Sequence, residues 1–177
     1  MEWSHAPSFQ EKSALLEQAR ELCARRRYYQ AADLLRALDL YPPVPGEQDL
    51  VHTVKSFLGL SIARSVGDYE EGERLARAGL AARSHQADAC HNLAQIYLDR
   101  GERGKAVPLL WKGLKANPRH RGLLLLAKSM GVRRPPPLSF LRRSHPLNIL
   151  VGRLRRKWFP PPSVPLPSEE EDSFYFE

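Results

Sequence analysis

The chain has 177 residues, of which 42% are hydrophobic, and its formal net charge is +7. A chain of this length can form one domain that buries roughly two thirds of its unfolded surface. Its N-terminal sequence, MEWSHAPSFQEKS, has no apolar stretch typical of a signal peptide, and no apolar run approaches the ~20 residues of a membrane-spanning helix. Its two cysteines, Cys23 and Cys90, are too far apart in sequence for a zinc-binding pair, so we expect both to be buried and reduced.

The positive charge is concentrated near the C-terminus. Residues 1–118 carry 16 basic and 15 acidic side chains, which nearly balance. Residues 119–160 carry 11 basic and no acidic side chains, whereas residues 161–177 carry five acidic and no basic ones. A basic segment followed by an acidic tail is a local signal, distinct from the average charge of the surface.

Residues 8–42 predict a helical hairpin after a flexible N-terminus at residues 1–7. Ser8 and Glu11 match a capping box, in which each side chain bonds the backbone N–H of the other residue. We expect one helix at residues 9–25, with Arg25, Arg26 and Arg27 in its last turn, and another at 28–40. The apolar positions predicted to be buried are Leu15, Leu16, Ala19, Leu22, Ala31, Ala32, Leu35 and Leu38. The segment YPPVPGEQ at residues 41–48 predicts a rigid loop.

Residues 53–86 and 87–120 match each other when one is shifted by 34 positions. The matching pairs are Ile62 and Ile96, Gly67 and Gly101, Leu75 and Leu109, Gly79 and Gly113, Leu80 and Leu114, and Ala82 and Ala116. Each block predicts two helices around a central Gly, because Gly adopts the left-handed conformation of a helix end at little cost. Self-similarity at one period indicates a helical repeat.

The block at residues 87–120 is similar to a tetratricopeptide repeat (TPR), a helix-turn-helix unit. The residues that carry the resemblance are Leu93, Ala94, Tyr97, Ala106, Leu110 and Pro118. Cys90 stands where the family pattern has Trp, and Ala94 stands where it has Gly. The resemblance implies an all-α solenoid of about three repeats, at residues 8–42, 53–86 and 87–120, in a domain spanning 8–131.

After Pro118 the chain predicts one capping helix and then a separate basic segment. The helix at residues 119–131, which ends at Gly131, would cover the last repeat, as the ends of solenoids require. Residues 132–160 form a Pro-bounded basic segment with an amphipathic helix at 146–158, whose expected N-cap is Ser144. Its apolar stripe consists of Leu147, Leu150, Val151, Leu154 and Trp158. Residues 161–177 predict a disordered acidic tail.

No catalytic, metal-binding or cofactor-binding pattern is present in the sequence. The six His residues include no i, i+4 pair and no neighbouring Cys pair. No strand pattern precedes a Gly-rich loop, so a phosphate loop of the nucleotide-binding type is not predicted. We therefore expect a protein that is not an enzyme and has no cofactor.

The resemblance implies a concave groove lined by the first helix of each repeat, which holds an extended or helical peptide. The matching positions are Ser61, Arg64, Asp88, His91, Asn92, Gln95 and Asp99. We expect His91, Gln95 and Asp99 to be exposed on one helix face. The clamp by which some relatives hold an acidic chaperone C-terminus needs Lys, Asn and Arg, and only Asn92 agrees with it.

The helix at residues 146–158 has three interpretations. It packs on the end of the solenoid through Leu150, Leu154 and Trp158, or it contacts an anionic membrane or an acidic partner. The residues for such a contact are Arg153, Arg155, Arg156, Lys157 and Trp158. Nucleic-acid binding is the least favoured, because aromatic residues are not interleaved with the charges.

From the sequence we expect a cytoplasmic, non-enzymatic scaffold or adaptor that binds a peptide or helix of a protein partner. The alternative is a peripheral assembly factor at the inner face of a membrane, which uses the basic helix. A secretion-type chaperone is a further alternative, which the chain resembles in size but not in its basic C-terminus.

Overall fold

The computed structural model describes residues 7–42, 44–83, 85–131 and 146–158. This part of the chain contains eight α-helices and no strand, so the prediction of an all-α fold is confirmed. The chain divides into two compact units, residues 1–123 and 124–177. The first unit holds the seven predicted groove positions, and the second holds the residues predicted for a contact of the basic helix.

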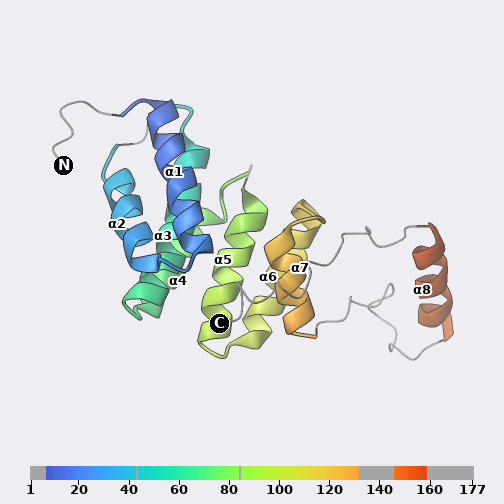
Figure 1. Cartoon of the computed structure of the whole chain (residues 1–177). Helices are drawn as coiled ribbons and strands as arrows, with labels where there is room; N and C mark the ends of the chain where they lie inside the picture. The colour runs from blue at the N-terminus through green and yellow to red at the C-terminus, as the bar shows by residue number, and fades with distance from the viewer. Residues whose placement is uncertain (1–6, 43, 84, 132–145, 159–177) are drawn as a thin grey trace. The chain divides into compact units, whose positions relative to one another are not determined.

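The first unit is built from three helical hairpins (Figure 1). They are formed by α1 (Phe9–Ala24) with α2 (Tyr28–Asp39), α3 (Gln48–Ser65) with α4 (Tyr69–Gly79), and α5 (Gln86–Asp99) with α6 (Arg103–Ala116). Helix α3 contacts α1, α2, α4 and α5 and is therefore the central helix of the unit. Helix α7 (Arg121–Ser129) begins at the end of the first unit, and α8 (Pro146–Trp158) lies in the second.

Most helix bounds agree with the sequence-based predictions, with two corrections. Helix α1 ends at Ala24, so Arg25, Arg26 and Arg27 form the turn after it, outside its last helical turn. Helix α3 begins at Gln48, within the predicted loop, because the preceding residue Glu47 is fixed by a buried ion pair. The predicted acidic tail lies outside the described residues, as do residues 1–6 and 132–145, which include Ser144.

Local signals predicted the helix ends well where a Gly or a capping residue was present. The Ser8–Glu11 capping box forms as expected. Gly67 and Gly101 take the left-handed conformation, with φ of 79° and 75°. In the first hairpin, Arg26 takes the same conformation, with φ of 58°.

The first and third hairpins end their first helices with the same pair of backbone hydrogen bonds. The bonds run from Arg26 N to Cys23 O (3.0 Å), Arg27 N to Leu22 O (2.8 Å), Gly101 N to Leu98 O (2.9 Å) and Glu102 N to Tyr97 O (2.7 Å). This is the Schellman arrangement, which needs one left-handed residue. Arg26 occupies that position although a side chain there is strained.

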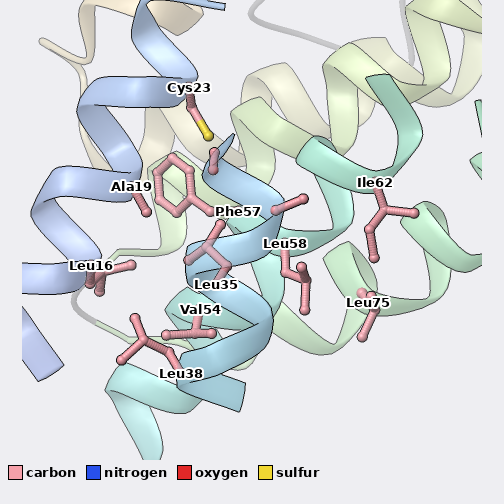
Figure 2. Close-up of a cluster of buried hydrophobic side chains, with 12 residues drawn as sticks. Leu16, Ala19, Cys23, Leu35, Leu38, Val54, Phe57, Leu58, Ile62 and Leu75 are labelled. Carbon is pink, nitrogen blue, oxygen red and sulfur yellow. The ribbon is translucent and has the colours of Figure 1, made fainter. Parts of the chain in front are cut away.

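A hydrophobic cluster joins α1, α2, α3 and α4 (Figure 2). Its members are Leu16, Ala19, Cys23, Ala31, Ala32, Leu35, Leu38, Val54, Phe57, Leu58, Ile62 and Leu75. Leu15 and Leu22, which were predicted to be buried, are only partly buried against it. Lys12 is buried instead, and its Nζ lies 2.8 Å from Oε2 of Glu47, so a charged pair fixes α1 to the start of α3.

Glycines allow the helices of the second and third hairpins to approach closely. A Cβ on Gly59 of α3 would lie 2.4 Å from the carbonyl oxygen of Gly72 of α4, so the two backbones touch. A Cβ on Gly79 would lie 2.5 Å from Cβ of Ser56, and one on Gly113 would lie 3.0 Å from Cβ of Cys90. The repeated Gly79–Gly113 pair therefore marks the same contact between the two helices of each hairpin.

Replacing Arg26 with Gly is expected to stabilise the protein, because Gly removes the steric cost of the left-handed conformation. We expect the free energy of unfolding to rise by roughly 0.5–1 kcal/mol, and Gly101→Ala to lower it by a similar amount. Urea unfolding followed by circular dichroism measures both. A lower free energy of unfolding for Arg26→Gly would show that the Arg side chain stabilises this turn by more than its strain.

Cys90 is fully buried in α5, as the sequence predicted, and burial raises the pKa of its thiol. Because the reactive species is the thiolate, native protein is expected to react slowly with a thiol reagent and to react rapidly once urea unfolds it. An Ala81→Cys variant provides a positive control, because Ala81 is exposed. Labelling of Cys90 in the native protein as fast as that of the thiol introduced in the control variant would contradict the orientation of α5.

Candidate functional site

Two of the seven predicted groove residues lie inside the first unit and do not line a groove. Ser61 and Asn92 are 0% and 2% exposed. The Sγ of Cys23 lies 3.3 Å from Oγ of Ser61, and Nδ2 of Asn92 donates to Oγ of Ser56 at 3.1 Å. The prediction was wrong for these two residues because Ser61 lies on the side of α3 that faces α1, and Asn92 lies on the side of α5 that faces α3, so neighbouring helices cover both.

The other predicted residues form a partly exposed surface, which we call the polar face. It consists of Arg64, Asp88, His91, Gln95 and Asp99, together with Arg20 of α1. His91 and Gln95 are partly buried, although both were expected to be exposed. Nε2 of Gln95 lies 2.8 Å from Nε2 of His91, and a Cβ added at Gly122 would lie 2.7 Å from that same ring atom.

Arg64 and Asp99 join α3 to α5 across the polar face. The guanidinium of Arg64 makes a two-point contact with the carboxylate of Asp99, with Nε to Oδ2 at 2.7 Å and Nη2 to Oδ1 at 3.1 Å. Its Nη1 also donates to the hydroxyl of Tyr28 in α2. Such a two-point ion pair fixes the position of both side chains more firmly than a single contact.

Asp88 is the centre of a second network on the polar face. Its Oδ1 lies 2.9 Å from Nε2 of His120, and its Oδ2 lies 3.2 Å from Nδ1 of His85 and 3.3 Å from Nη2 of Arg20. Nδ1 of His120 accepts a hydrogen bond from the backbone N–H of Leu123 at 3.1 Å, so Nε2 carries the proton that His120 donates to Asp88. Burial by itself raises the pKa of Asp88, but the bond from His120 and the charge of Arg20 outweigh it and lower the pKa to about 2.

A pocket of about 470 Å³ lies beside Asp88. Its charged and titratable lining residues are Arg20, Arg83, His85, Asp88, Arg119, His120 and Arg121, and its other lining residues are Gln86, Ala87, Ala116 and Asn117. Four guanidinium groups therefore face one carboxylate. We call this pocket the basic pocket; Asp88 belongs both to it and to the polar face.

Sequence reasoning missed the basic pocket because its residues come from α1, from the first turn of α5, and from the loops before α5 and after α6 with the helix ends beside them. The 34-residue repeat contains a usable signal. His85 and Arg119 are one period apart, so a basic residue recurs at the same junction between hairpins. The two junctions are the loop before α5 and the loop between α6 and α7. Residues of both loops line the same pocket.

His91 is a neutral residue within this charged surface. Burial is the largest cause of its low pKa of about 3, the electrostatic effects of His120 and Arg64 lower the pKa further, and the charge of Asp88 opposes them. The ring centroids of His91 and His120 are 5.4 Å apart. A proton on His91 would therefore be buried and would lie in the field of the Arg64 guanidinium, which disfavours the folded state.

The residues predicted for a contact of the basic helix lie in α8. Arg153 is exposed, as are Leu147, Leu150 and Leu154 of the apolar stripe. The side chains of Arg155, Arg156, Lys157 and Trp158 lie outside the described residues. Among the helices described by the structure, none is both long and apolar enough to cross a membrane.

The described residues include no cluster of three or more His, Cys, Asp or Glu side chains placed to hold a metal ion. Comparison with protein-family models and with curated proteins finds no match for this chain.

The low pKa of His91 predicts a loss of stability in mild acid. The unfolded chain binds a proton on this residue near its ordinary pKa of 6.5, whereas the folded chain binds it only near 3. Stability is therefore complete above about pH 6.5 and declines as the pH falls toward 3, by at most about 1.4 kcal/mol per pH unit from this residue.

The variant His91→Gln keeps a polar side chain that does not titrate. Urea unfolding between about pH 6 and about pH 4 is expected to show a slope that is shallower than that of the wild type by roughly 1 kcal/mol per pH unit. A His52→Gln variant serves as a control on α3. Equal slopes for the wild type and His91→Gln would show that His91 is protonated in the folded protein.

Proposed function

We propose that this chain is a non-enzymatic interaction scaffold of the TPR type, which binds a peptide or helix of a protein partner on the polar face. The observation that carries the proposal is the convergence of polar side chains from the first helix of each hairpin. Arg20 comes from α1, Arg64 comes from α3, and Asp88, Gln95 and Asp99 come from α5. Three hairpins with similar turns place these helices in one unit.

The ion pairs of the polar face favour binding because they hold its side chains in place before a partner arrives. A partner that meets ordered side chains loses less conformational entropy than one that must order them. The side chains of Arg64 and Asp99 remain about one quarter exposed, so their remaining hydrogen-bonding atoms are accessible. An extended or helical segment with polar side chains matches this surface.

A second candidate function rests on α8. Leu147, Ile149, Leu150 and Leu154 are exposed large apolar side chains in this helix. The sequence adds Arg153, Arg155, Arg156 and Lys157, so apolar and basic residues occur in one short helix. This composition favours peripheral attachment to an anionic membrane surface, which would bring the scaffold to a membrane.

The test of the proposed scaffold is partner capture by the full chain and by two matched double variants. Gln95→Ala with Asp99→Ala alters the polar face, whereas Gln30→Ala with Asp33→Ala removes the same side-chain types from exposed positions on α2. Proteins retained by the wild type are identified by mass spectrometry, and their binding to purified protein is then measured. We expect the first variant to weaken binding of a retained partner by about tenfold or more and the second to leave it unchanged.

Circular dichroism and urea unfolding of both variants provide the control for folding. Surface substitutions of this kind are expected to change the free energy of unfolding by about 1 kcal/mol or less. If the two variants bind the partner equally well, the polar face is not the binding surface.

A further inference from the structure

The basic pocket has more positive than negative side chains in its lining. Asp88 is the one carboxylate among the residues that line the described pocket, and it is already bonded to Arg20, His85 and His120. Its charge is therefore shared among three donors. The guanidinium groups of Arg83, Arg119 and Arg121 add to the positive charge of the same lining.

Arg83 and Arg119 carry accessible guanidinium groups on an anchored backbone. Within the described part of the chain, neither side chain forms an ion pair with a carboxylate, and both residues are exposed. Their backbones are fixed by hydrogen bonds, from Arg83 N to Oδ1 of Asp49 at 2.5 Å and from Arg119 N to Oδ1 of Asn117 at 3.1 Å. These two residues belong to the loop before α5 and the loop after α6, so they approach the pocket from different segments.

The start of α5 adds a further feature that favours an anion. Gln86 and Ala87, the first two residues of α5, line the pocket. The N-cap residue His85 makes no side-chain hydrogen bond to the first turn of this helix. The backbone N–H groups of this first turn and the positive end of the helix dipole therefore add to the guanidinium groups around the pocket.

We propose that the basic pocket binds a phosphate monoester, carried as a phosphorylated side chain on the partner segment that lies on the polar face. A phosphate monoester has three terminal oxygens and close to two negative charges, which match several guanidinium forks at once. A carboxylate has two oxygens and one charge, so it satisfies fewer of these donors. The pocket volume of about 470 Å³ accommodates the phosphoryl group together with the side chain that carries it.

That a partner segment carries the phosphate rests on the proposed scaffold function, because Asp88 belongs both to the pocket and to the polar face that would bind this segment. The preference for a phosphoryl group rests on the pocket alone. The two parts can therefore be tested separately, with a probe that does not require the partner to be known.

The probe is phosphoserine blocked at both termini, titrated into the full chain and followed by amide NMR at constant low ionic strength. We expect saturable shifts at Gln86, Ala87 and Asp88, and affinity that falls as salt is added. Blocked glutamate is expected to bind at least about tenfold more weakly, because it lacks the third oxygen and the second charge. Inorganic phosphate is expected to bind no more tightly than blocked phosphoserine.

The decisive variant is Arg83→Gln with Arg119→Gln, which removes two accessible guanidinium groups of the pocket without breaking a described ion pair. Its affinity for blocked phosphoserine is expected to fall by about tenfold or more, since hydrogen bonds to charged groups are the strong ones. Arg27→Gln with Arg36→Gln is the matched control, because it also removes two guanidinium groups from exposed positions. Arg27 directly precedes α2, and Arg36 lies within that helix. The control is expected to bind as the wild type does.

Several results would overturn the inference. The absence of saturable binding, or equal losses in the two double variants, would show that the pocket has no phosphate site. Equal binding of blocked glutamate would assign the pocket to carboxylates, and tighter binding of inorganic phosphate would remove the phosphorylated side chain as its ligand. Partner capture that depends on Gln95 and Asp99 without any phosphoserine binding would retain the scaffold function and reject this inference alone.

Discussion

The ion and hydrogen-bond network of Asp88 is the interaction on which the candidate site depends. One carboxylate joins Arg20 of α1, His85 before α5 and His120 after α6. These segments are far apart in sequence, and three of the pocket arginines lie in or beside the two loops. Without a negative charge at this point, the positive side chains would repel one another in a partly buried space. Asp88 thus makes a basic pocket compatible with the folded unit.

The all-α fold and most helix bounds could be predicted because they follow from local chemistry. Ser8 with Glu11 marks a helix start, and Gly67 and Gly101 mark left-handed turns. Arg26 takes the same left-handed conformation without any local signal, in a turn closed by backbone hydrogen bonds from Arg26 and Arg27. The start of α3 could not be predicted either, since it depends on the buried contact between Lys12 and Glu47, which lie far apart in sequence.

The candidate site was only partly predictable, because periodicity identifies a helix face but not how deeply that face is buried. Asp99 is exposed as expected and Arg64 is partly exposed, whereas Ser61 and Asn92 are covered by neighbouring helices. The basic pocket requires side chains from separate segments, so no single helix pattern reveals it. Only the 34-residue spacing of the two basic junctions, at His85 and Arg119, indicates that they meet.

The most direct test of this account is a ¹³C NMR titration of the Asp88 side-chain carboxyl in the full chain. Donors from three segments predict a pKa of about 2, well below the ordinary value of 3.8. The titration should therefore show Asp88 still ionised at pH values where exposed aspartates are protonated. A pKa at or above the ordinary value would show that Arg20, His85 and His120 do not converge on Asp88. Asp88 would then not connect the polar face with the basic pocket.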